Sequence, residues 1–345
     1  MAVTTVSKVE LHELKSVHLP EPVPYAVLTP PGYEAAAPLP LCLVLMGGGG
    51  SRQSLVDTKP LFDAWWSDGS LAPMVLATPS AGMSYYLDLP DGGVRWGSFL
   101  AEDFLAHLRA TCNVAAEASS TAITGISMGG YGALKVAFAR PDQFGVVAAV
   151  QPIVEPGLDD AQIGARNRLH HGSGGPAELI GPGRNAGVFR ANNPANRAQA
   201  NAGAIRESGL AIYIEVGDDD FVNAHDGTEF LHRVLWELDI SHEYHLVRGG
   251  DHGGPTFIPR MRAAYVWVGA VLSELRSAAS AELSASERAV TAWIEGGMLG
   301  EPPAAAPSSR EFVRIVRARL QAVRAQAAAA DPHTHRRYGV LPRLS

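Results

Sequence analysis

The stretch TAITGISMGGYGAL, residues 121–134, places a single serine between glycines. Gly125 and Gly129 stand two positions before and two positions after Ser127, which gives the pattern G-x-S-x-G. The apolar residues before Ser127 favour a buried strand, and those after it favour the start of a helix. In a nucleophile elbow the serine sits on a sharp strand-to-helix turn, and flanking glycines leave room for that turn. The stretch therefore predicts that the hydroxyl of Ser127 is exposed at the carboxyl end of a strand.

The abundance of glycine leaves a second interpretation of this pattern open. In a chain with 36 glycines, G-x-S-x-G can arise by chance, and the glycines can serve only the close packing of a helix against a strand. The position of the pentapeptide, where an apolar strand meets a helix, favours the nucleophile elbow. The N-terminal N–H groups of the following helix would then also point toward Ser127.

Short apolar runs recur along the chain and predict strands that are buried on both faces. They are LCLVLM (41–46), MVLAT (74–78), TAITGI (121–126), GVVAAV (145–150), LAIYIEV (210–216) and EYHLV (243–247). Segments with helical spacing lie between them, such as the one with Leu100, Phe104 and Leu108. This alternation predicts an α/β fold with a mostly parallel central sheet and helices on both faces, preceded by two antiparallel strands within residues 1–30.

Composition and charge exclude several classes of function. The chain of 345 residues has a formal net charge of -7, so no overall basic field would hold nucleic acid. The N-terminal residues lack the apolar core of a secretion signal, and no run approaches the roughly 20 apolar residues that span a bilayer. We therefore expect a cytoplasmic protein without stable membrane insertion. The two cysteines, Cys42 and Cys112, are expected to be buried free thiols.

Two regions interrupt the alternation and define the expected domains. Residues 152–205 are rich in Gly, Pro, Asn and Arg without a clear period, which predicts a lid-like insertion or pocket wall. Its arginines and histidines either recognise an anionic group or belong to a solvated loop. The sheet pattern ends near residue 278, so residues 1–278 are expected to form one domain. Residues 279–345 are expected to form a helical C-terminal extension with a linker near 300–309.

The last expected helix of the extension combines an apolar face with several arginines. It could bind an acidic membrane surface. The favoured interpretation is that it packs against the first domain or a second subunit, which predicts a homo-oligomer formed through the C-terminal helices.

A serine hydroxyl needs a neighbouring base to become a good nucleophile, and two later loops supply the residues for this. LAIYIEV runs into GDDDFV, which places Asp218, Asp219 and Asp220 in one loop, and EYHLV runs into RGGDHGG, which contains His252. Loops at the carboxyl ends of parallel strands meet at one edge of a sheet, so we expect them close to Ser127. His252 would accept the serine proton, and one of the aspartates would orient the imidazole. The alternative for His252 is a loop histidine that caps backbone groups.

A glycine-rich loop after the first of these strands predicts an oxyanion hole, a set of donors for the charge that develops on a carbonyl oxygen. One donor is expected to be the backbone N–H of Met128, and the other is expected within GGGGS, residues 47–51. The loop lacks the pattern of a phosphate-binding loop. The histidines do not show the H-E-x-x-H spacing either, so neither a metal nor a cofactor is expected.

With these loops, the chain resembles the putative-esterase family of α/β-hydrolases. This family includes esterase D and S-formylglutathione hydrolases, feruloyl and acetyl-xylan esterases, enterochelin-type esterases and secreted mycolyltransferases. The matching stretches are LVLMGGGGS, RWGSFLAEDFLAHLR, GISMGGYGALKVAFARPDQFGVVAAV, VGDDDF and GGDHGG, all within residues 25 to about 275. The run SMGGYGAL…PDQF is the most specific of them.

The resemblance implies an α/β-hydrolase fold and assigns roles to individual residues. It implies Ser127 as nucleophile, His252 as base and Asp220 as acid, because Asp220 matches the aspartate of the family's G-x-x-D-F pattern. Gly48 would be the second oxyanion donor beside Met128. The implied reaction is hydrolysis of a small-molecule carboxylic ester or thioester through an acyl-enzyme intermediate.

The sequence also departs from the family pattern. Met46 stands where many relatives have His or Asp, and AVQPIVEPG (149–157) replaces the common Ser-Gly after the fifth strand. The cysteine-bearing loop of formylglutathione hydrolases is not recognisable. These departures leave the acyl group and the leaving group open. An acyltransferase would use the same residues with an alcohol acceptor, whereas a non-catalytic binding protein would normally lack one of the three.

Overall fold

The computed structural model describes residues 6–90, 92–167, 186–279 and 292–293. The chain divides into two compact units, Met1–Leu275 and Arg276–Ser345. The expected linker near 300–309 and the helix after it lie outside the described residues. The extension and its boundary therefore stay predictions.

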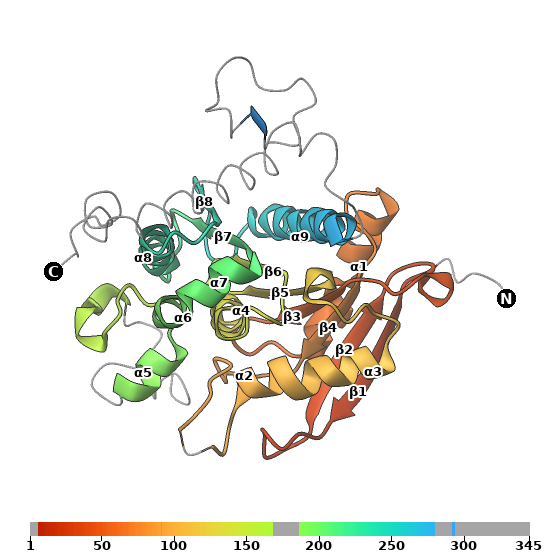
Figure 1. The fold of residues 1–345 in the computed structure, drawn as a ribbon, viewed down its shortest axis with the longest axis horizontal. Helices are drawn as coiled ribbons and strands as arrows, with labels where there is room; N and C mark the ends of the chain where they lie inside the picture. Colours follow the sequence, from red (N-terminus) through yellow and green to blue (C-terminus); the bar gives the residue numbers. More distant parts are fainter. Residues whose placement is uncertain (1–5, 91, 168–185, 280–291, 294–345) are drawn as a thin grey trace. The chain divides into compact units, whose positions relative to one another are not determined.

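Within the described residues, an eight-stranded sheet forms the centre of the first unit (Figure 1). The strands are β1 (Lys8–Leu14), β2 (Val23–Thr29), β3 (Leu41–Leu45), β4 (Val75–Pro79), β5 (Thr121–Ile126), β6 (Val146–Val150), β7 (Ala211–Gly217) and β8 (Glu243–Val247). Their order across the sheet is β1-β2-β4-β3-β5-β6-β7-β8. Strand β2 pairs antiparallel with both β1 and β4, and the six strands from β4 to β8 in this order are parallel. The predicted mostly parallel sheet is thus confirmed.

Helices cover both faces of this sheet, as predicted. They are α1 (Arg52–Ser67), α2 (Trp96–Ser98), α3 (Leu105–Thr111), α4 (Met128–Ala139), α5 (Ala186–Asn192), α6 (Pro194–Ala200), α7 (Ala202–Ser208), α8 (Ala224–Glu237) and α9 (Phe257–Ala279). A π-helical segment, η2 (Phe99–Phe104), leads into α3, and short 3₁₀ turns are η1 (Tyr33–Ala35), η3 (Ala118–Ser120), η4 (Asp160–Gln162) and η5 (Ala165–Asn167).

Helices α1 and α9 lie together on one face of the sheet (Figure 1). Phe62 of α1 and Tyr265 of α9 meet edge to face with their ring centroids 4.9 Å apart, and both are buried. Alternate strand residues such as Cys42 and Ala122 point into the same apolar cluster. Because side chains alternate along a strand, the neighbouring residues point to the other face.

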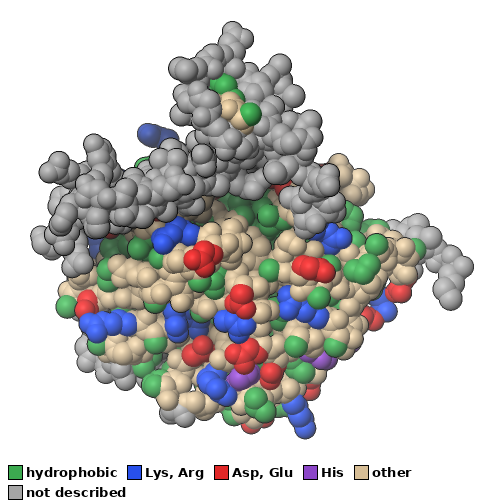
Figure 2. Space-filling model, in the orientation of Figure 1, with side chains coloured by type: hydrophobic (Ala, Val, Ile, Leu, Met, Phe, Trp, Pro, Cys, Tyr) green, Lys and Arg blue, Asp and Glu red, His purple; other side chains and the backbone are tan. Residues whose placement is uncertain are grey.

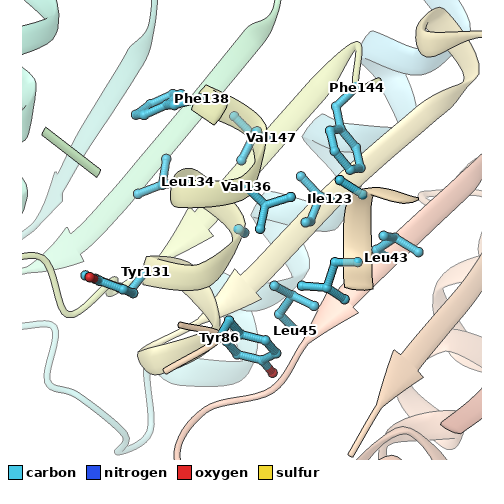
Figure 3. Packing of buried hydrophobic residues seen from close by; sticks show 14 of the residues in the cluster. Leu43, Leu45, Tyr86, Ile123, Tyr131, Leu134, Val136, Phe138, Phe144 and Val147 are labelled. Carbon is cyan, nitrogen blue, oxygen red and sulfur yellow. The ribbon is translucent and has the colours of Figure 1, made fainter. Parts of the chain in front are cut away.

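Helix α4 lies on that other face, across the middle of the sheet. Figure 3 shows Val136 of α4 beside Ile123 of β5, within a cluster that also contains Leu43 and Val147. All residues of α4 except the last are buried, so this helix is covered on every side and belongs to the core. Full burial of one such aliphatic side chain contributes about 1.5–3 kcal/mol. The helix that follows Ser127 is therefore firmly held.

The predicted insertion, residues 152–205, contains packed helices at its C-terminal end. Ala195 and Ala198 of α6 and Ile205 of α7 join the core around α4. Asn193 caps α6 by accepting from the N–H of Ala195 at 3.3 Å. Residues 168–185 lie outside the described part of the chain, so the lid-like role stays a prediction.

The surface of the first unit carries both signs of charge. On the face that Figure 2 presents, acidic and basic side chains alternate without a large patch of one sign. None of the helices in the described ranges is long and apolar enough to span a membrane.

Candidate active site

Ser127 occupies the turn between β5 and α4 in an unusual backbone conformation. Its φ is 57° and its ψ is -120°, a region that residues with a side chain rarely adopt. The backbone N–H of Ser127 donates to the carbonyl of Val150 at 3.0 Å, which anchors the turn to β6. The chain thus reverses sharply from strand to helix at this one residue.

The two flanking glycines make this turn sterically feasible. A Cβ on Gly125 would lie 2.1 Å from the carbonyl oxygen of Gly129, and a Cβ on Gly129 would lie 2.0 Å from the carbonyl oxygen of Leu45. Both distances are far below van der Waals contact, and both partners are backbone atoms that cannot rotate away. The glycines therefore allow the backbones of β5, α4 and β3 to pack closely. This close packing holds the turn in place.

His252 lies between Ser127 and Asp220 and is hydrogen-bonded to both. Its Nε2 is 2.9 Å from Oγ of Ser127, and its Nδ1 is 2.7 Å from Oδ2 of Asp220. A neutral imidazole that donates from Nδ1 to the carboxylate presents Nε2 as an acceptor to the hydroxyl. The three predicted residues, which come from loops after β5, β7 and β8, thus form one continuous hydrogen-bonded line.

Asp220 is buried, and its carboxylate is fully hydrogen-bonded. Oδ1 accepts from the N–H groups of Val222 at 2.9 Å and Ala224 at 3.4 Å, while Oδ2 faces His252. Burial by itself raises the pKa of Asp220, but the bond to His252, its charge and the two N–H groups outweigh burial and leave the pKa below its usual value. The group therefore remains a carboxylate at neutral pH.

The neighbouring aspartates hold the loops together instead. Oδ1 of Asp218 accepts from the N–H of Gly249 at 2.6 Å. The backbone N–H of Asp219 donates to the carbonyl of Gly250 at 3.0 Å. Of the three aspartates, the structure brings Asp220 to the imidazole, which is the residue that the family resemblance implies.

The glycine loop after β3 lies against Ser127. A Cβ on Gly47 would lie in ordinary van der Waals contact with Cβ of Ser127, at 3.5 Å, so the glycine loop and Ser127 are neighbours. Within the described residues, the N–H groups of Gly48 and Met128 donate no hydrogen bond to protein. We expect these two N–H groups to face an oxygen atom of a ligand, as in an oxyanion hole.

Sequence reasoning did not identify the residue that holds this glycine loop. The hydroxyl of Tyr86, a buried residue, donates to the carbonyl of Met46 at 3.0 Å. Tyr85 and Tyr86 both have positive φ, 50° and 53°, in a loop that also contacts Met128 through a 3.4 Å bond from the N–H of Tyr85 to its sulfur. No local sequence pattern marks such a contact.

Two exposed apolar side chains stand at the sides of the line of three residues. The ring of Phe221 is 68% exposed, and its centroid is 5.7 Å from that of the His252 imidazole. Met83, 42% exposed, lies beside Gly48. A cavity of about 300 Å³ with an apolar lining is bounded by Met83, Ser84, Leu87, Leu89, Val94 and Trp96. The surroundings of the site therefore offer apolar contacts to a ligand.

A metal centre is not evident beside these residues. Within the ranges that the structure describes, no group of three or more His, Cys, Asp or Glu side chains is arranged to hold a metal ion.

Solved structures of known enzymes share this fold. A ferulic acid esterase is 20% identical, with a TM-score of 0.62, and the alignment covers 78% of this chain and 99% of that one. The fluorophosphonate-binding serine hydrolase F (FphF) of Staphylococcus aureus is 15% identical, with a TM-score of 0.61 and coverages of 77% and 99%. An S-formylglutathione hydrolase from Agrobacterium tumefaciens is 19% identical, with a TM-score of 0.59 and coverages of 79% and 97%.

A match to a sequence family identifies the family of this chain. No curated protein matches the chain. The family model described as "Putative esterase" matches residues 16–268, which is well over half of the chain and contains every residue of the site. The chain therefore belongs to the putative-esterase family, and it is an ester hydrolase with an α/β-hydrolase fold.

Proposed function

We propose that this enzyme hydrolyses carboxylic esters through a catalytic triad of Ser127, His252 and Asp220. The observation that carries the proposal is the unbroken line of hydrogen bonds, 2.9 Å from Ser127 to His252 and 2.7 Å from His252 to Asp220. These lengths allow a proton to pass from the hydroxyl to the imidazole while the carboxylate holds the ring.

In the first half of the reaction, Oγ of Ser127 attacks the carbonyl carbon of the ester. The hydroxyl proton passes to Nε2 of His252, and the π electrons of the carbonyl move onto its oxygen. The N–H groups of Met128 and Gly48 stabilise this oxyanion. When the tetrahedral intermediate collapses, the bond to the leaving oxygen breaks, and that oxygen takes the proton from Nε2. An acyl-enzyme and a free alcohol result.

In the second half, water replaces the alcohol. His252 accepts a proton from the water as its oxygen attacks the acyl carbon, and the same two N–H groups again face the oxyanion. Collapse breaks the bond to Ser127, which regains its proton from Nε2. The products are a carboxylic acid and the free enzyme.

The two apolar side chains distinguish the acyl side from the alcohol side. The leaving group must lie next to Nε2 of His252, because it receives its proton there. Phe221, whose ring lies against His252, is then placed to contact the leaving group. Met83, which lies beside Gly48 and also lines the apolar cavity, is placed to contact the acyl chain. This arrangement favours an apolar acyl group and an apolar or aromatic leaving group.

Turnover of p-nitrophenyl acetate and p-nitrophenyl butyrate tests the proposal. We expect Ser127→Ala to lower kcat by about 10⁴-fold or more, because loss of the nucleophile removes the acyl-enzyme route. Unfolding of the variant, followed by circular dichroism, controls for an intact fold. If folded Ser127→Ala turns over either ester at the wild-type rate, the catalytic assignment is wrong.

Product analysis extends the same assay to the alternatives. A thioester of the same acyl group tests whether sulfur is accepted as the leaving atom. An added alcohol acceptor tests for transfer: formation of a new ester in place of the acid would identify an acyltransferase that uses the same three residues.

A further inference from the structure

A buried ion pair lies beneath the loop that carries His252. Nε of Arg260, on α9, donates to Oε1 of Glu215, on β7, at 2.8 Å, and the two side chains are only 4% and 1% exposed. Removing two charges from water costs hydration free energy. The attraction between the charges offsets this cost only when further hydrogen bonds are made. The partners of the remaining Arg260 N–H groups therefore show which part of the protein the ion pair holds in place.

Those remaining donors lead to the backbone of the histidine loop. Nη1 of Arg260 donates to the carbonyl of Asp251, and Nη2 donates to Oε1 of Gln151 at 3.0 Å. The amide nitrogen of Gln151 in turn donates to the carbonyl of His252. The carbonyls on the two sides of the His252 α-carbon are thus held, one by a side chain of α9 and the other by a side chain that follows β6.

Gln151 reaches this carbonyl because its backbone is held in a rare conformation. Its φ is 42°, and its N–H donates to the carbonyl of Glu215 at 2.6 Å. A non-glycine residue in this region costs about 1–3 kcal/mol and persists only where its surroundings fix it. Gln151 is buried, and it lies in the stretch where the sequence departs from the Ser-Gly common in the family.

The amide side of the histidine loop is held as well. Oδ1 of Asp251 accepts from the N–H of His252 at 2.6 Å and from the N–H of Phe221 at 3.2 Å. The second bond joins the histidine loop to the loop of Asp220. Both the carbonyl and the N–H of His252 are therefore engaged, which fixes the backbone from which its imidazole extends.

We propose that Glu215, Arg260 and Gln151 form a positioning unit that fixes the backbone of His252 and, with it, the approach of Nε2 to Ser127. The proposal rests on the proposed function, in which His252 carries the proton. The three residues act through His252 and not on the substrate. A displacement of about 1 Å in a catalytic group can lower a rate by about 10²-fold, so a backbone clamp of this kind has a measurable effect.

Gln151→Met is the variant that separates positioning from folding. Methionine has a similar length and apolar volume but neither donates to the carbonyl of His252 nor accepts from Arg260. We expect kcat for p-nitrophenyl acetate to fall about 10- to 100-fold with little change in KM. The rate of inactivation by an alkyl fluorophosphonate should fall by the same factor, because both reactions begin with attack by Ser127 and proton transfer to His252.

Gln143→Met is the matched control. Oε1 of Gln143 also accepts from an arginine, Nη1 of Arg109 at 3.1 Å, but the pair lies away from the site. We expect this variant to keep the wild-type kcat whatever its effect on stability. Unfolding in urea is measured for both variants, and rates are compared under conditions in which each is fully folded.

Arg260→Lys and Arg260→Met provide a second, independent series. Lysine keeps the charge opposite Glu215 and can reach one of the two acceptors, so we expect kcat in the order wild type, Arg260→Lys, Arg260→Met. A purely structural role would lower stability in this order without changing kcat of the folded protein.

The outcomes distinguish failure of this proposal from failure of the proposed function. If Ser127→Ala is inactive and folded Gln151→Met keeps the wild-type kcat and inactivation rate, the positioning unit is wrong and the triad stands. If Ser127→Ala is fully active, the proposed function itself is wrong. If neither Gln151→Met nor Arg260→Lys unfolds cooperatively, the three residues belong to the stabilising core, and the positioning role is overturned.

Discussion

At Asp220, burial and hydrogen bonding act in opposite directions on the same carboxyl group. Burial raises its pKa, whereas His252 and the N–H groups of Val222 and Ala224 lower it, and the net result is a lowered pKa. Because the pKa of Asp220 is lower in the folded than in the unfolded chain, the contacts of its carboxylate stabilise the folded protein at pH values above the pKa of Asp220 in the unfolded chain. The stabilisation is lost as the pH falls through the folded value.

Replacing this carboxylate by an amide tests its role at the residue scale. Asp220→Asn keeps the volume but can donate to Nδ1 of His252, which stabilises the wrong tautomer, so we expect kcat to fall by about 10³- to 10⁴-fold. Asp219→Asn should remain close to the wild-type rate, because only the backbone of Asp219 contacts the histidine loop. Steady-state kinetics with p-nitrophenyl acetate measure both. Equal losses in the two variants would contradict the assignment of Asp220.

Glycine 129 offers a second test at this scale. In Gly129→Ala the new Cβ would lie 2.0 Å from the carbonyl oxygen of Leu45, so the strand or the helix must move. We expect a loss of about 3 kcal/mol or more in the free energy of unfolding, at the upper end of overpacking effects. Gly203→Ala, in α7, is the control: nothing lies near its Cβ position, and alanine should stabilise the helix by about 0.4–1 kcal/mol. Urea unfolding compares the two, and a stable Gly129→Ala would refute the steric argument.

At the scale of elements, the buried strands could be predicted closely from the sequence. The run at 41–46 corresponds to β3 (Leu41–Leu45), whose residues are all buried. The run at 243–247 coincides with β8 (Glu243–Val247), but β8 is an edge strand whose residues are half-buried or exposed, so its predicted burial on both faces is wrong. Strands covered on both faces require continuous apolar residues, so the pattern is strong. Helices α5, α6 and α7 could not be predicted in the same way, because each has only seven residues and an apolar period needs more than two turns to be visible.

The candidate site could be predicted only in part, for a related reason. G-x-S-x-G and the strand ends point to Ser127 and His252 because local backbone geometry leaves a local trace. Three consecutive aspartates share one loop, and the residues alone do not show which carboxylate reaches the imidazole. Arg260 reaches Gln151 across 109 positions of the chain, and no local pattern records such a contact.

Helix α4 carries an ionisable group in the core. The amino group of Lys135, 3% exposed, donates to the carbonyl of Tyr86 and to Oδ1 of Asn192, the latter at 3.1 Å. Burial is the main cause that lowers the pKa of Lys135 from 10.5 to about 8. In this way the helix after Ser127 is tied to the Tyr86 loop, which in turn holds the glycine loop.

A pH series tests this buried amine at the scale of the helix. Between the folded pKa of about 8 and the unfolded value of 10.5, the unfolded chain binds more protons, so stability contributed by Lys135 rises with pH in this window. We subtract the unfolding free energy of Lys135→Met from that of the wild type. We expect this signed difference to increase by about 1–3 kcal/mol from pH 8 to pH 10, because only the wild type gains stability. A constant difference over this range would show that the amine is not perturbed as described.

For the whole molecule, the first unit contains everything that the proposed reaction uses. Ser127, Asp220, His252 and the glycine loop lie within Met1–Leu275, and the family model ends at residue 268. Its core includes residues from both faces of the sheet. A domain of this size with its own core is expected to fold independently.

Removing residues 300–345 tests whether the first unit alone supports activity and whether the C-terminal helices join subunits. We expect kcat and KM to stay near the wild-type values, because the site lies in the first unit. If the C-terminal helices join subunits, light scattering should report a smaller particle for the truncated chain. An unchanged oligomer with intact activity would exclude these residues as the subunit interface.

The backbone of Ser127, with φ of 57°, places stability and turnover in conflict at one position. Such a conformation costs about 1–3 kcal/mol in a residue with a side chain, which is a sizeable part of the total stability of a typical domain. Glycine would relieve this cost but would remove the hydroxyl. Under the proposed mechanism, selection for heat resistance alone would therefore favour an inactive protein here, and a thermostable form of this enzyme must gain its stability elsewhere in the chain.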